Sequence, residues 1–283
     1  MRFVMFLHEG KRRLGVVEGD TVTEVREPAD LMDVIAAGPA GLAKAKSAVA
    51  GAGTGATHAL AGLKFAQPIA RPGKLICLGL NYAAHAAEGG HKTPEYPAFF
   101  IRVTTSLIAA GEPLICPKVS EQLDYEAELM VIIGKRARHV PEDKALDHVF
   151  GYTLFNDGSV RNYQRKSSQW TIGKNFDGTG PVGPVVVTPD ELPPGCVGLK
   201  IESRLNGRVL QSANTKDMLV SVAQSIHLLS EAMTLEPGDM IATGTPEGVG
   251  HARKPPLWMK PGDVIEVEVE KIGTLRNPIA AEG

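Results

Sequence analysis

The chain has 283 residues, of which 43% are hydrophobic and 22% are charged, and its formal net charge at pH 7 is −2. This composition is typical of a globular protein with a large core, and it lacks the excess of basic residues that nucleic acids and anionic membranes attract. No apolar run approaches the roughly 20 residues that span a bilayer, so we expect neither a nucleic-acid partner nor a membrane partner.

The first apolar run and the cysteines indicate the compartment. Residues 3–7 form a short apolar run that is followed by acidic and basic residues, which is the wrong order for a signal peptide. The three cysteines, Cys77, Cys116 and Cys196, are far apart and odd in number, which favours buried thiols in a reducing environment. We therefore expect a cytoplasmic protein.

Residues 1–66 are predicted to form a small N-terminal α/β domain. Alternating and helical apolar patterns predict three strands and two helices there, at residues 3–7, 11–17, 21–25, 30–37 and 40–50. Asp30 is the expected N-cap of the first helix. A glycine cluster at residues 51–56 follows a helix instead of a strand, so it predicts a surface turn and not a phosphate-binding loop.

A buried strand and a short helix open the second predicted domain, residues 67–283. The strand is expected at residues 74–80, and Asn81 directly after it is a candidate cap for the helix. His85 and Glu88 are three residues apart, so they share a helical face and can act as an acid–base pair near pH 7. An ordinary surface pair is the alternative. Glycines and a proline follow at residues 89–94, so residues 82–95 are expected to act as a lid.

Three acids mark the ends of two predicted strands. Glu126 and Glu128 precede and open a β-branched apolar run, and their spacing places both on one face of a strand. Asp157 closes a second apolar run, residues 149–155. Three carboxylates at two strand ends suit a hard cation such as Mg²⁺. A solvated strand face paired with basic residues is the alternative, and Asp124 could compete for the ligand role.

Later segments supply further polar candidates. Lys174 is predicted to lie on a glycine-flanked loop, where functional residues concentrate, although an ion pair with Asp177 or another acid would also explain it. Thr245, in the glycine-rich loop at residues 243–250, could bind an oxyanion or carboxylate together with backbone amides. A plain connection between strands is the alternative for that loop.

Two regular elements are also predicted in this half of the chain. Asn206 and Gly207 predict a tight hairpin turn between residues 199–205 and 209–211. The clearest helix spans residues 220–233, with Ser221 as its cap and His227 in a structural role.

Seven motifs, taken together and in this order, resemble the fumarylacetoacetate hydrolase family. They cover residues of about 72 to 275 and are Gly79-Leu80-Asn81-Tyr82 with His85 and Glu88, Asp124-Tyr125-Glu126-Ala127-Glu128-Leu129, Asn156-Asp157 with Arg161 and Gln164, Gln169-Trp170, Gly173-Lys174-Asn175-Phe176-Asp177, Pro181-Val182-Gly183-Pro184, and Thr243-Gly244-Thr245-Pro246-Glu247-Gly248-Val249-Gly250.

The resemblance implies an α+β fold with a mixed β-roll or β-sandwich catalytic domain, in a homodimer. It implies Mg²⁺ or Mn²⁺ held by the three acids, and a lid helix that orders its His–Glu dyad over bound substrate. It also implies that Lys174 lies near the reacting carbonyl, and that Arg161, Gln164 and Thr245 contact the substrate. The chain has Arg102 and Asn162 where the family usually has lysine and aspartate, which leaves the substrate open.

The activity that these residues indicate is cleavage of a carbon–carbon bond. We expect a metal-dependent hydrolase of acylpyruvate-type or related diketo acids, in which the dyad activates water. Oxaloacetate decarboxylase and hydroxymuconate-type isomerase are alternatives on the same scaffold. A non-catalytic metal or ligand-binding module is disfavoured, because it would not need Lys174 or the dyad. A nicotinamide oxidoreductase is disfavoured too, because no glycine-rich loop follows the first strand of a βαβ unit.

Overall fold

The computed structural model describes residues 1–50, 56–90, 92 and 95–283. The expected turn at residues 51–56, apart from Ala56, and residues 91, 93 and 94 of the expected lid lie outside the described residues. None of the helices found in the described ranges is long and apolar enough to cross a membrane.

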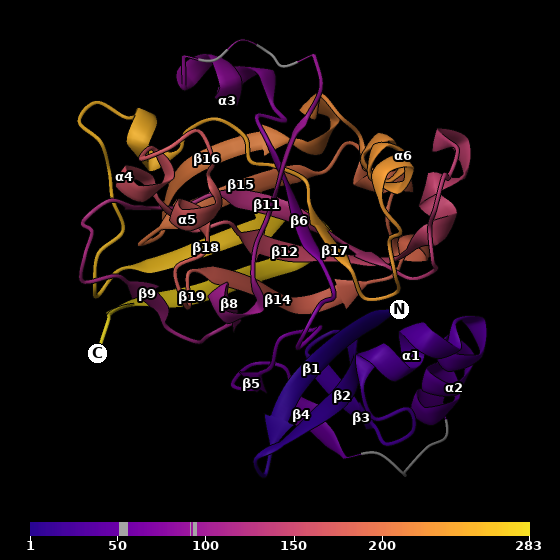
Figure 1. Cartoon of the computed structure of the whole chain (residues 1–283). Coiled ribbons are helices and arrows are strands. Elements are labelled where there is room, and N and C mark those ends of the chain that lie inside the picture. Colours follow the sequence, from indigo (N-terminus) through magenta and orange to yellow (C-terminus); the bar gives the residue numbers. More distant parts are fainter. Residues whose placement is uncertain (51–55, 91, 93–94) are drawn as a thin grey trace.

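The first unit contains a hairpin, a third strand and two helices, as predicted (Figure 1). Its elements are β1 (Arg2–His8), β2 (Lys11–Glu18), β3 (Thr21–Val25), α1 (Leu31–Ala37), α2 (Pro39–Ala50), β4 (Thr57–Ala59) and β5 (Lys64–Phe65). Asp30 caps α1, since its side chain accepts a hydrogen bond from the amide of Met32. This confirms the predicted N-cap.

The rest of the chain is rich in strands. Its helices are α3 (Ala83–Glu88), α4 (Arg161–Gln164), α5 (Thr171–Lys174) and α6 (Val222–Ala232). Its strands are β6 (Leu75–Gly79), β7 (Ala98–Ile101), β8 (Leu107–Ala109), β9 (Leu114–Cys116), β10 (Leu123–Asp124), β11 (Ala127–Ile133), β12 (Val149–Asn156), β13 (Ser159–Val160), β14 (Gly180–Val187), β15 (Lys200–Leu205), β16 (Arg208–Asn214), β17 (Met240–Ala242), β18 (Val264–Val269) and β19 (Gly273–Ala281).

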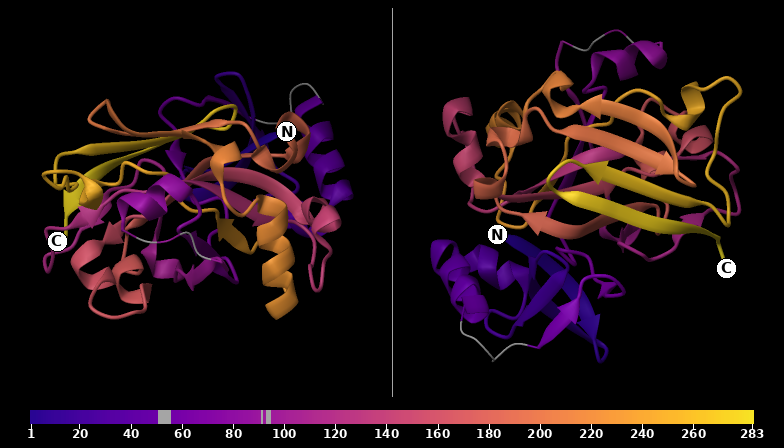
Figure 2. Two further views of the ribbon diagram at one scale, coloured as in Figure 1. Left: turned by 90° about the horizontal axis from the view of Figure 1, so that it is seen from above. Right: turned by 180° about the vertical axis from the view of Figure 1, so that it is seen from behind.

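Two large sheets organise most of these strands into an α+β fold, the predicted class, and β10 and β13 form a separate two-stranded sheet. The larger sheet runs in the order β4-β3-β2-β1-β14-β12-β11-β17-β6-β7, with β5 beside β1 and β8 beside β14. The smaller sheet runs β16-β15-β18-β19-β9 and packs across β11 and β12 (Figures 1 and 2). Every residue of β11 is buried, because one face meets the smaller sheet and the other packs in an apolar cluster that includes Phe3 and Val34 of the first unit.

The N-terminal strands continue the larger sheet. In β1, Phe3 pairs with Val186 of β14, and its fully buried ring lies 5.9 Å from the ring of Phe150 on β12. We propose that residues 1–66 and 67–283 are two units that share one core at this junction. Figure 2 shows the first unit beside the main body, at the side opposite α3.

Three details of the expected elements are confirmed. Asn206 and Gly207 both have positive φ angles, 52° and 78°, as a tight hairpin turn requires. The side chain of Ser221 accepts the amide of Gln224 and so caps α6. His227 is structural, because its Nδ1 atom lies 2.8 Å from the carbonyl oxygen of Val140.

Two expectations were wrong. Asn81 does not cap α3; its side-chain amide donates to the carbonyls of Val220 and Thr243 and so joins β6 to two later segments. Lys174 does not lie on a loop, since it ends the short helix α5. The first error arose because Asn81 forms long-range hydrogen bonds in place of a local cap.

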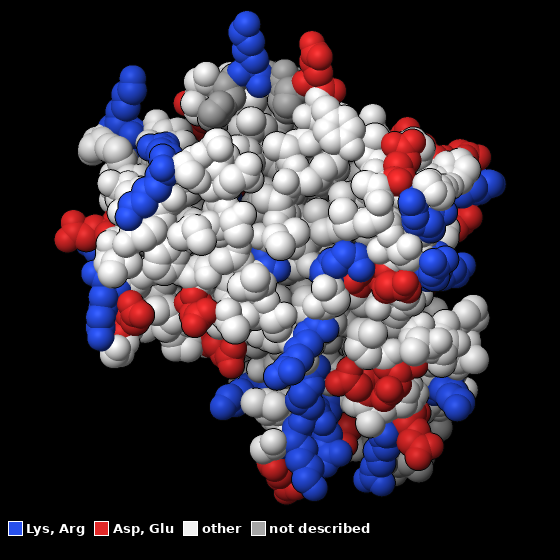
Figure 3. All heavy atoms as spheres, in the orientation of Figure 1, with Lys and Arg blue, Asp and Glu red and all other residues white. Residues whose placement is uncertain are grey.

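Charged side chains are mixed in sign over the face drawn in Figure 3. Lys and Arg lie among Asp and Glu around the periphery and over the N-terminal unit. This face therefore presents no extended field of one sign.

Replacement of Phe3 tests whether the two units share a core. We expect Phe3→Ala to lower the free energy of unfolding by about 3–5 kcal/mol, because it removes a buried aromatic ring from the junction. Chemical denaturation should show one transition at lower denaturant. The control Val119→Ala, at a side chain that is 59% exposed, should change the free energy by less than about 0.5 kcal/mol. Two transitions, of which Phe3→Ala shifts one, would contradict a shared core.

Candidate active site

The three predicted acids converge where β11 and β12 meet. Ala127 pairs with Asn156, so Glu126 and Asp157 lie at adjoining strand ends, and the Asp157 amide donates to the Glu126 carbonyl at 3.0 Å. Glu128 is the second residue of β11 and lies on the same side as Glu126. One carboxylate oxygen of each acid lies within 4.8 Å of the others, and all three acids are buried.

Three buried cations face these acids. Lys174 Nζ lies 2.6 Å from Glu126 Oε2 and 2.7 Å from Asp157 Oδ2. The Arg161 guanidinium lies 2.6 Å from Glu126 Oε1, and Arg102 forms an ion pair with Asp157. The alternative that Lys174 pairs with a neighbouring acid is thus also true, although its partners are the predicted metal ligands and not Asp177.

The charge balance divides the acids into two kinds. Burial opposes ionisation of Glu126, but Lys174 and Arg161 outweigh burial and hold its pKa well below the usual range. Burial raises the pKa of Glu128, and the negative charges of Asp157 and Glu126 raise it further. Glu128 accepts one hydrogen bond, from the Gly244 amide at 2.9 Å, and has no ion pair among the described residues.

A divalent cation fits this donor set. Each ionised carboxylate oxygen can accept more than one partner, so the ion pairs of Glu126 and Asp157 leave lone pairs available. Glu128 is a buried carboxyl beside two like charges, and a cation between the three acids would remove that repulsion. Carboxylate oxygens are the ligands that Mg²⁺ and Mn²⁺ prefer. The three acids can therefore hold a divalent metal ion.

Asp124 does not join the three converging acids. Its Oδ1 atom accepts the amides of Gly250 at 2.7 Å and Tyr125 at 2.9 Å. Its Oδ2 atom accepts Arg161 Nε at 2.7 Å and the His251 amide at 3.0 Å. Burial opposes its ionisation, but Arg161 and His251 lower its pKa. Asp124 thus orients Arg161 and the chain around His251.

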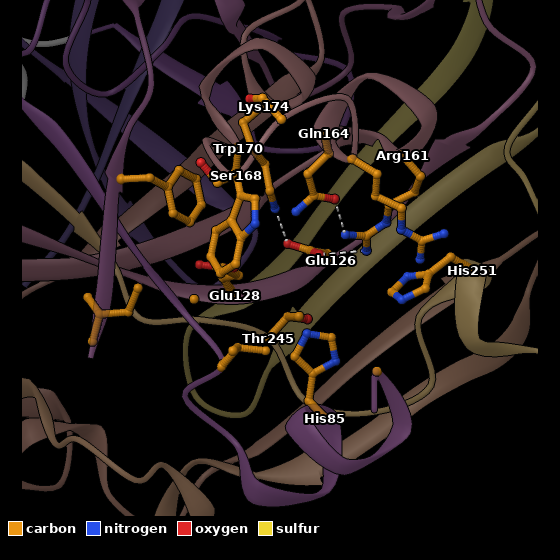
Figure 4. A pocket seen from close by; sticks show the side chains of 17 residues that line it. His85, Glu126, Glu128, Arg161, Gln164, Ser168, Trp170, Lys174, Thr245 and His251 are labelled. Carbon is orange, nitrogen blue, oxygen red and sulfur yellow. Dashed lines mark hydrogen bonds and ion pairs between the residues drawn. The ribbon is translucent and has the colours of Figure 1, made fainter. Parts of the chain in front are cut away.

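The His–Glu pair predicted from spacing is formed on α3. His85 Nδ1 lies 2.8 Å from Glu88 Oε1, and the other carboxylate oxygen of Glu88 accepts the Gly248 amide at 2.9 Å. His85 lines the same cavity as Glu126 and Glu128, and Figure 4 shows its ring beside Thr245, opposite Gln164 and Lys174. Glu88 therefore both orients His85 and connects α3 to the glycine-rich loop at residues 243–250.

That loop supplies one amide to each of three acids. The amides of Gly244, Gly248 and Gly250 donate to Glu128, Glu88 and Asp124. Gly248 has a φ angle of 96°, and a Cβ atom there would lie 2.5 Å from the Leu210 carbonyl oxygen. At this position only glycine allows the chain to pass so close to β16.

One cavity of about 460 Å³ connects these groups. Its apolar wall is formed by Leu78, Leu80, Phe100 and Trp170. Its polar wall is formed by His85, Glu126, Glu128, Arg161, Gln164, Arg165, Ser167, Ser168, Lys174, Thr245 and His251. Glu88 and Asp157 do not line the cavity, but they contact its lining residues His85 and Lys174. The volume is in the usual range for small-molecule sites.

The three expected substrate contacts all reach the cavity. Arg161 donates to Asp124, Glu126 and Gln164, so its guanidinium is largely engaged by the protein (Figure 4). The side-chain oxygen of Gln164 accepts a hydrogen bond from Arg161 at 2.9 Å, and its amide nitrogen has no hydrogen-bond partner among the residues that the structure describes. Thr245 Oγ1 accepts Gln211 at 2.8 Å, so its own proton can be donated elsewhere.

Sequence reasoning missed three residues of the site. His251 and Arg165 line the cavity, and Gln211 on β16 supports Thr245. Arg165 follows Arg161 by one helical turn, a signal that spacing alone could have given. His251 and Gln211 had no local signal, because each reaches the site through contacts with residues far away in sequence.

Comparison with known proteins identifies the same family as the seven sequence motifs. Residues 74–280 match the family model "Fumarylacetoacetate (FAA) hydrolase C-terminal". The chain is 42% identical over 226 residues to oxaloacetate tautomerase YisK of Bacillus subtilis, covering 78% of this chain and 75% of that protein.

Two solved structures share the whole fold. Maleylpyruvate hydrolase from Sphingobium sp. SYK-6, in complex with manganese(II) and pyruvate, aligns with a TM-score of 0.84 at 29% identity, over 100% of both chains. The 5-carboxymethyl-2-hydroxymuconate delta-isomerase from Mycobacterium smegmatis aligns with a TM-score of 0.80 at 33% identity, also over 100% of both chains. The chain belongs to the fumarylacetoacetate hydrolase family.

Proposed function

We propose that this chain is a divalent-metal-dependent enzyme that interconverts the keto and enol forms of a 2-oxo acid of the oxaloacetate type. The observation that carries the proposal is that His85, which Glu88 orients, lines the same cavity as Glu126 and Glu128, and that Asp157 completes the group of converging acids. The 42% identity to a protein named oxaloacetate tautomerase supports this reaction among those known for similar folds.

The proposed cofactor is Mg²⁺ or Mn²⁺, held by Glu126, Glu128 and Asp157. When bound, it supplies a Lewis acid that stabilises negative charge on the oxo oxygen of the substrate. Lys174 and Arg161 hold the Glu126 carboxylate ionised and in position. Lys174 also lines the cavity, which is consistent with its expected place near the reacting carbonyl.

The proton transfer is assigned to His85. Glu88 accepts the Nδ1–H of His85, which leaves the Nε2 atom as the base that removes a proton from the carbon next to the oxo group. The protonated Nε2 atom then gives that proton to the enolate oxygen, which forms the enol and restores the neutral base. The reverse sequence regenerates the oxo acid, so the reaction is balanced without a further reactant. Thr245, with its hydroxyl supported by Gln211, can donate to the developing enolate oxygen.

Hydrolysis of acylpyruvate-type acids is the second candidate. The same His85 would take a proton from water, the hydroxide would attack the far carbonyl, and the carbon–carbon bond would break to give an enolate that is then protonated on carbon. The observation that favours it is the manganese and pyruvate complex of a maleylpyruvate hydrolase with the same fold. Decarboxylation of oxaloacetate and isomerisation of a hydroxymuconate also pass through an enolate.

We also propose that the chain forms a homodimer. Ile101, Val103 and Ile172 are exposed apolar side chains, at 54%, 43% and 63% of their full area. Asn175 bonds to the backbone of residues 101 and 103, so the end of β7 and α5 form one surface. β7 ends the larger sheet in the described chain, and an uncovered apolar edge favours association.

Binding of the proposed metal should change the melting temperature of the protein as well as its activity. We expect Mg²⁺ or Mn²⁺ to raise the Tm of the wild type, because the cation binds the folded state alone. Glu128→Gln should raise the Tm in EDTA, since it removes a buried carboxyl beside two like charges, and it should abolish the response to metal. Differential scanning calorimetry measures both, with Glu121→Gln as an exposed acid control. A metal response that survives Glu128→Gln would refute the ligand assignment.

Replacement of His85 separates the two candidate reactions. Wild type and His85→Ala should be assayed for enolisation of oxaloacetate and for hydrolysis of an acylpyruvate at saturating Mg²⁺, in spectrophotometric assays. We expect enolisation by the wild type and a loss of about 10²-fold or more in the variant, the usual scale for a positioned base. His148→Ala, outside the cavity, is the control. Hydrolysis without enolisation by the wild type would favour the second candidate reaction. Unchanged rates in His85→Ala would show that the His85–Glu88 pair is not the catalytic base.

The dimer can be tested by placing a charge on the apolar edge. Ile172→Lys should shift the mass measured by light scattering from two chains to one, because burial of an unpaired charge opposes association. Val119→Lys, on another exposed apolar side chain, should leave the mass unchanged. A single-chain mass for the wild type would contradict the proposal.

A further inference from the structure

The two buried cations that line the cavity already form ion pairs with carboxylates of the protein. Lys174 contacts two carboxylates, of Glu126 and Asp157, and Arg161 contacts two, of Asp124 and Glu126. Their charges balance buried acids. A substrate that brings a second carboxylate, besides the one next to its oxo group, therefore needs another cationic partner.

Arg165 lines the same cavity and is not engaged in this way. Its backbone amide donates to the Arg161 carbonyl at 3.2 Å, which fixes its Cα atom one turn beyond Arg161 at the end of α4. Its side chain is exposed and makes no ion pair or hydrogen bond with any residue that the structure describes. Arg165 can thus reach an anion in the cavity without breaking a contact.

His251 presents a second polar group to the cavity. Its amide donates to Asp124 at 3.0 Å, and its Nδ1 atom lies 3.3 Å from the same carboxylate oxygen, so one side of the ring is fixed. The Nε2 atom has no partner in the described part of the chain. Figure 4 shows the ring beside Arg161, on the other side of the pocket from Trp170 and Lys174. The ring is only slightly exposed, at 14% of its side-chain area.

We propose that Arg165 and His251 bind the second carboxylate of a dicarboxylic 2-oxo acid and thereby select such acids over monocarboxylic ones. The proposal rests on the proposed function, because it assumes that the other end of the substrate faces the three acids. Arg165 supplies the charge, and His251 supplies a fixed hydrogen-bonding atom whose orientation Asp124 determines. Both are specificity-determining residues, and neither takes part in the proton transfer.

The test uses two ligands that differ only in the second carboxylate. Malate and lactate both offer a carboxylate and a 2-hydroxyl for chelation, and malate alone carries the remote carboxylate. Their affinities are measured by isothermal titration calorimetry with the Mg²⁺-loaded full chain. We expect the wild type to bind malate more tightly than lactate, and Arg165→Gln to weaken malate binding about 10- to 100-fold, the scale for a hydrogen bond to a charged group, with little effect on lactate.

Two further variants test whether a loss of malate affinity comes from the subsite itself or from the change in charge. His251→Asn retains an N–H for Asp124 in place of Nδ1 but removes the Nε2 atom, so it should also weaken malate selectively. Lys166→Gln is the matched charge control, because the Lys166 ammonium lies over the Tyr163 ring at 3.5 Å and does not line the cavity. It should bind malate like the wild type.

The outcomes distinguish this subsite from the proposed function. Wild-type malate binding that is no tighter than lactate binding, or that Arg165→Gln leaves unchanged, overturns the subsite. A loss in Lys166→Gln as large as in Arg165→Gln overturns it as well, since the effect would then be long-range charge. Oxalate, which tests chelation without a remote carboxylate, should bind to all variants. Failure of oxalate to bind to the wild type with Mg²⁺ would overturn the metal assignment and the subsite together.

Discussion

The structure depends on a cluster of charges removed from water. Four buried carboxylates, of Asp124, Glu126, Glu128 and Asp157, face three buried cations, of Arg102, Arg161 and Lys174. Such a cluster is costly when one partner is missing, because each buried charge needs a counter-charge and hydrogen bonds. The excess negative charge falls on Glu128, and this imbalance favours the binding of a cation beside the ion-pair network.

The glycine-rich loop at residues 243–250 connects the parts of the site. It donates one backbone amide to a metal-site acid, one to the partner of His85 and one to the acid that positions His251. A shift of this loop would therefore change the acids, the proposed base and the proposed selectivity together. Amides are well suited to this task, since they carry no charge that would compete with the cation.

The sequence was informative where the signal is local. Strand alternation placed Glu126 and Glu128 on one side, helical spacing paired His85 with Glu88, and turn chemistry predicted the hairpin at Asn206. It failed where distant segments compete for one side chain. Asn81 looked like a helix cap but bonds to residues 220 and 243. The ion pairs of Arg161 with Asp124 and Glu126 had no local signal. His251 had no signal, since its partner lies 127 positions earlier in the chain.

The pairing of β1 with β14 has a consequence for synthesis on the ribosome. The strands β1 to β3 are made before β14 and can pair locally, yet the partner of the first half of β1 lies about 180 residues later, at Val185–Val187. Until that segment has left the ribosome, the edge of β1 at Arg2–Val4 lacks its partner strand. An uncovered strand edge can pair with another chain. A slow stretch of translation before β14 leaves the ribosome would lengthen this exposure, whereas a pause after its release would not.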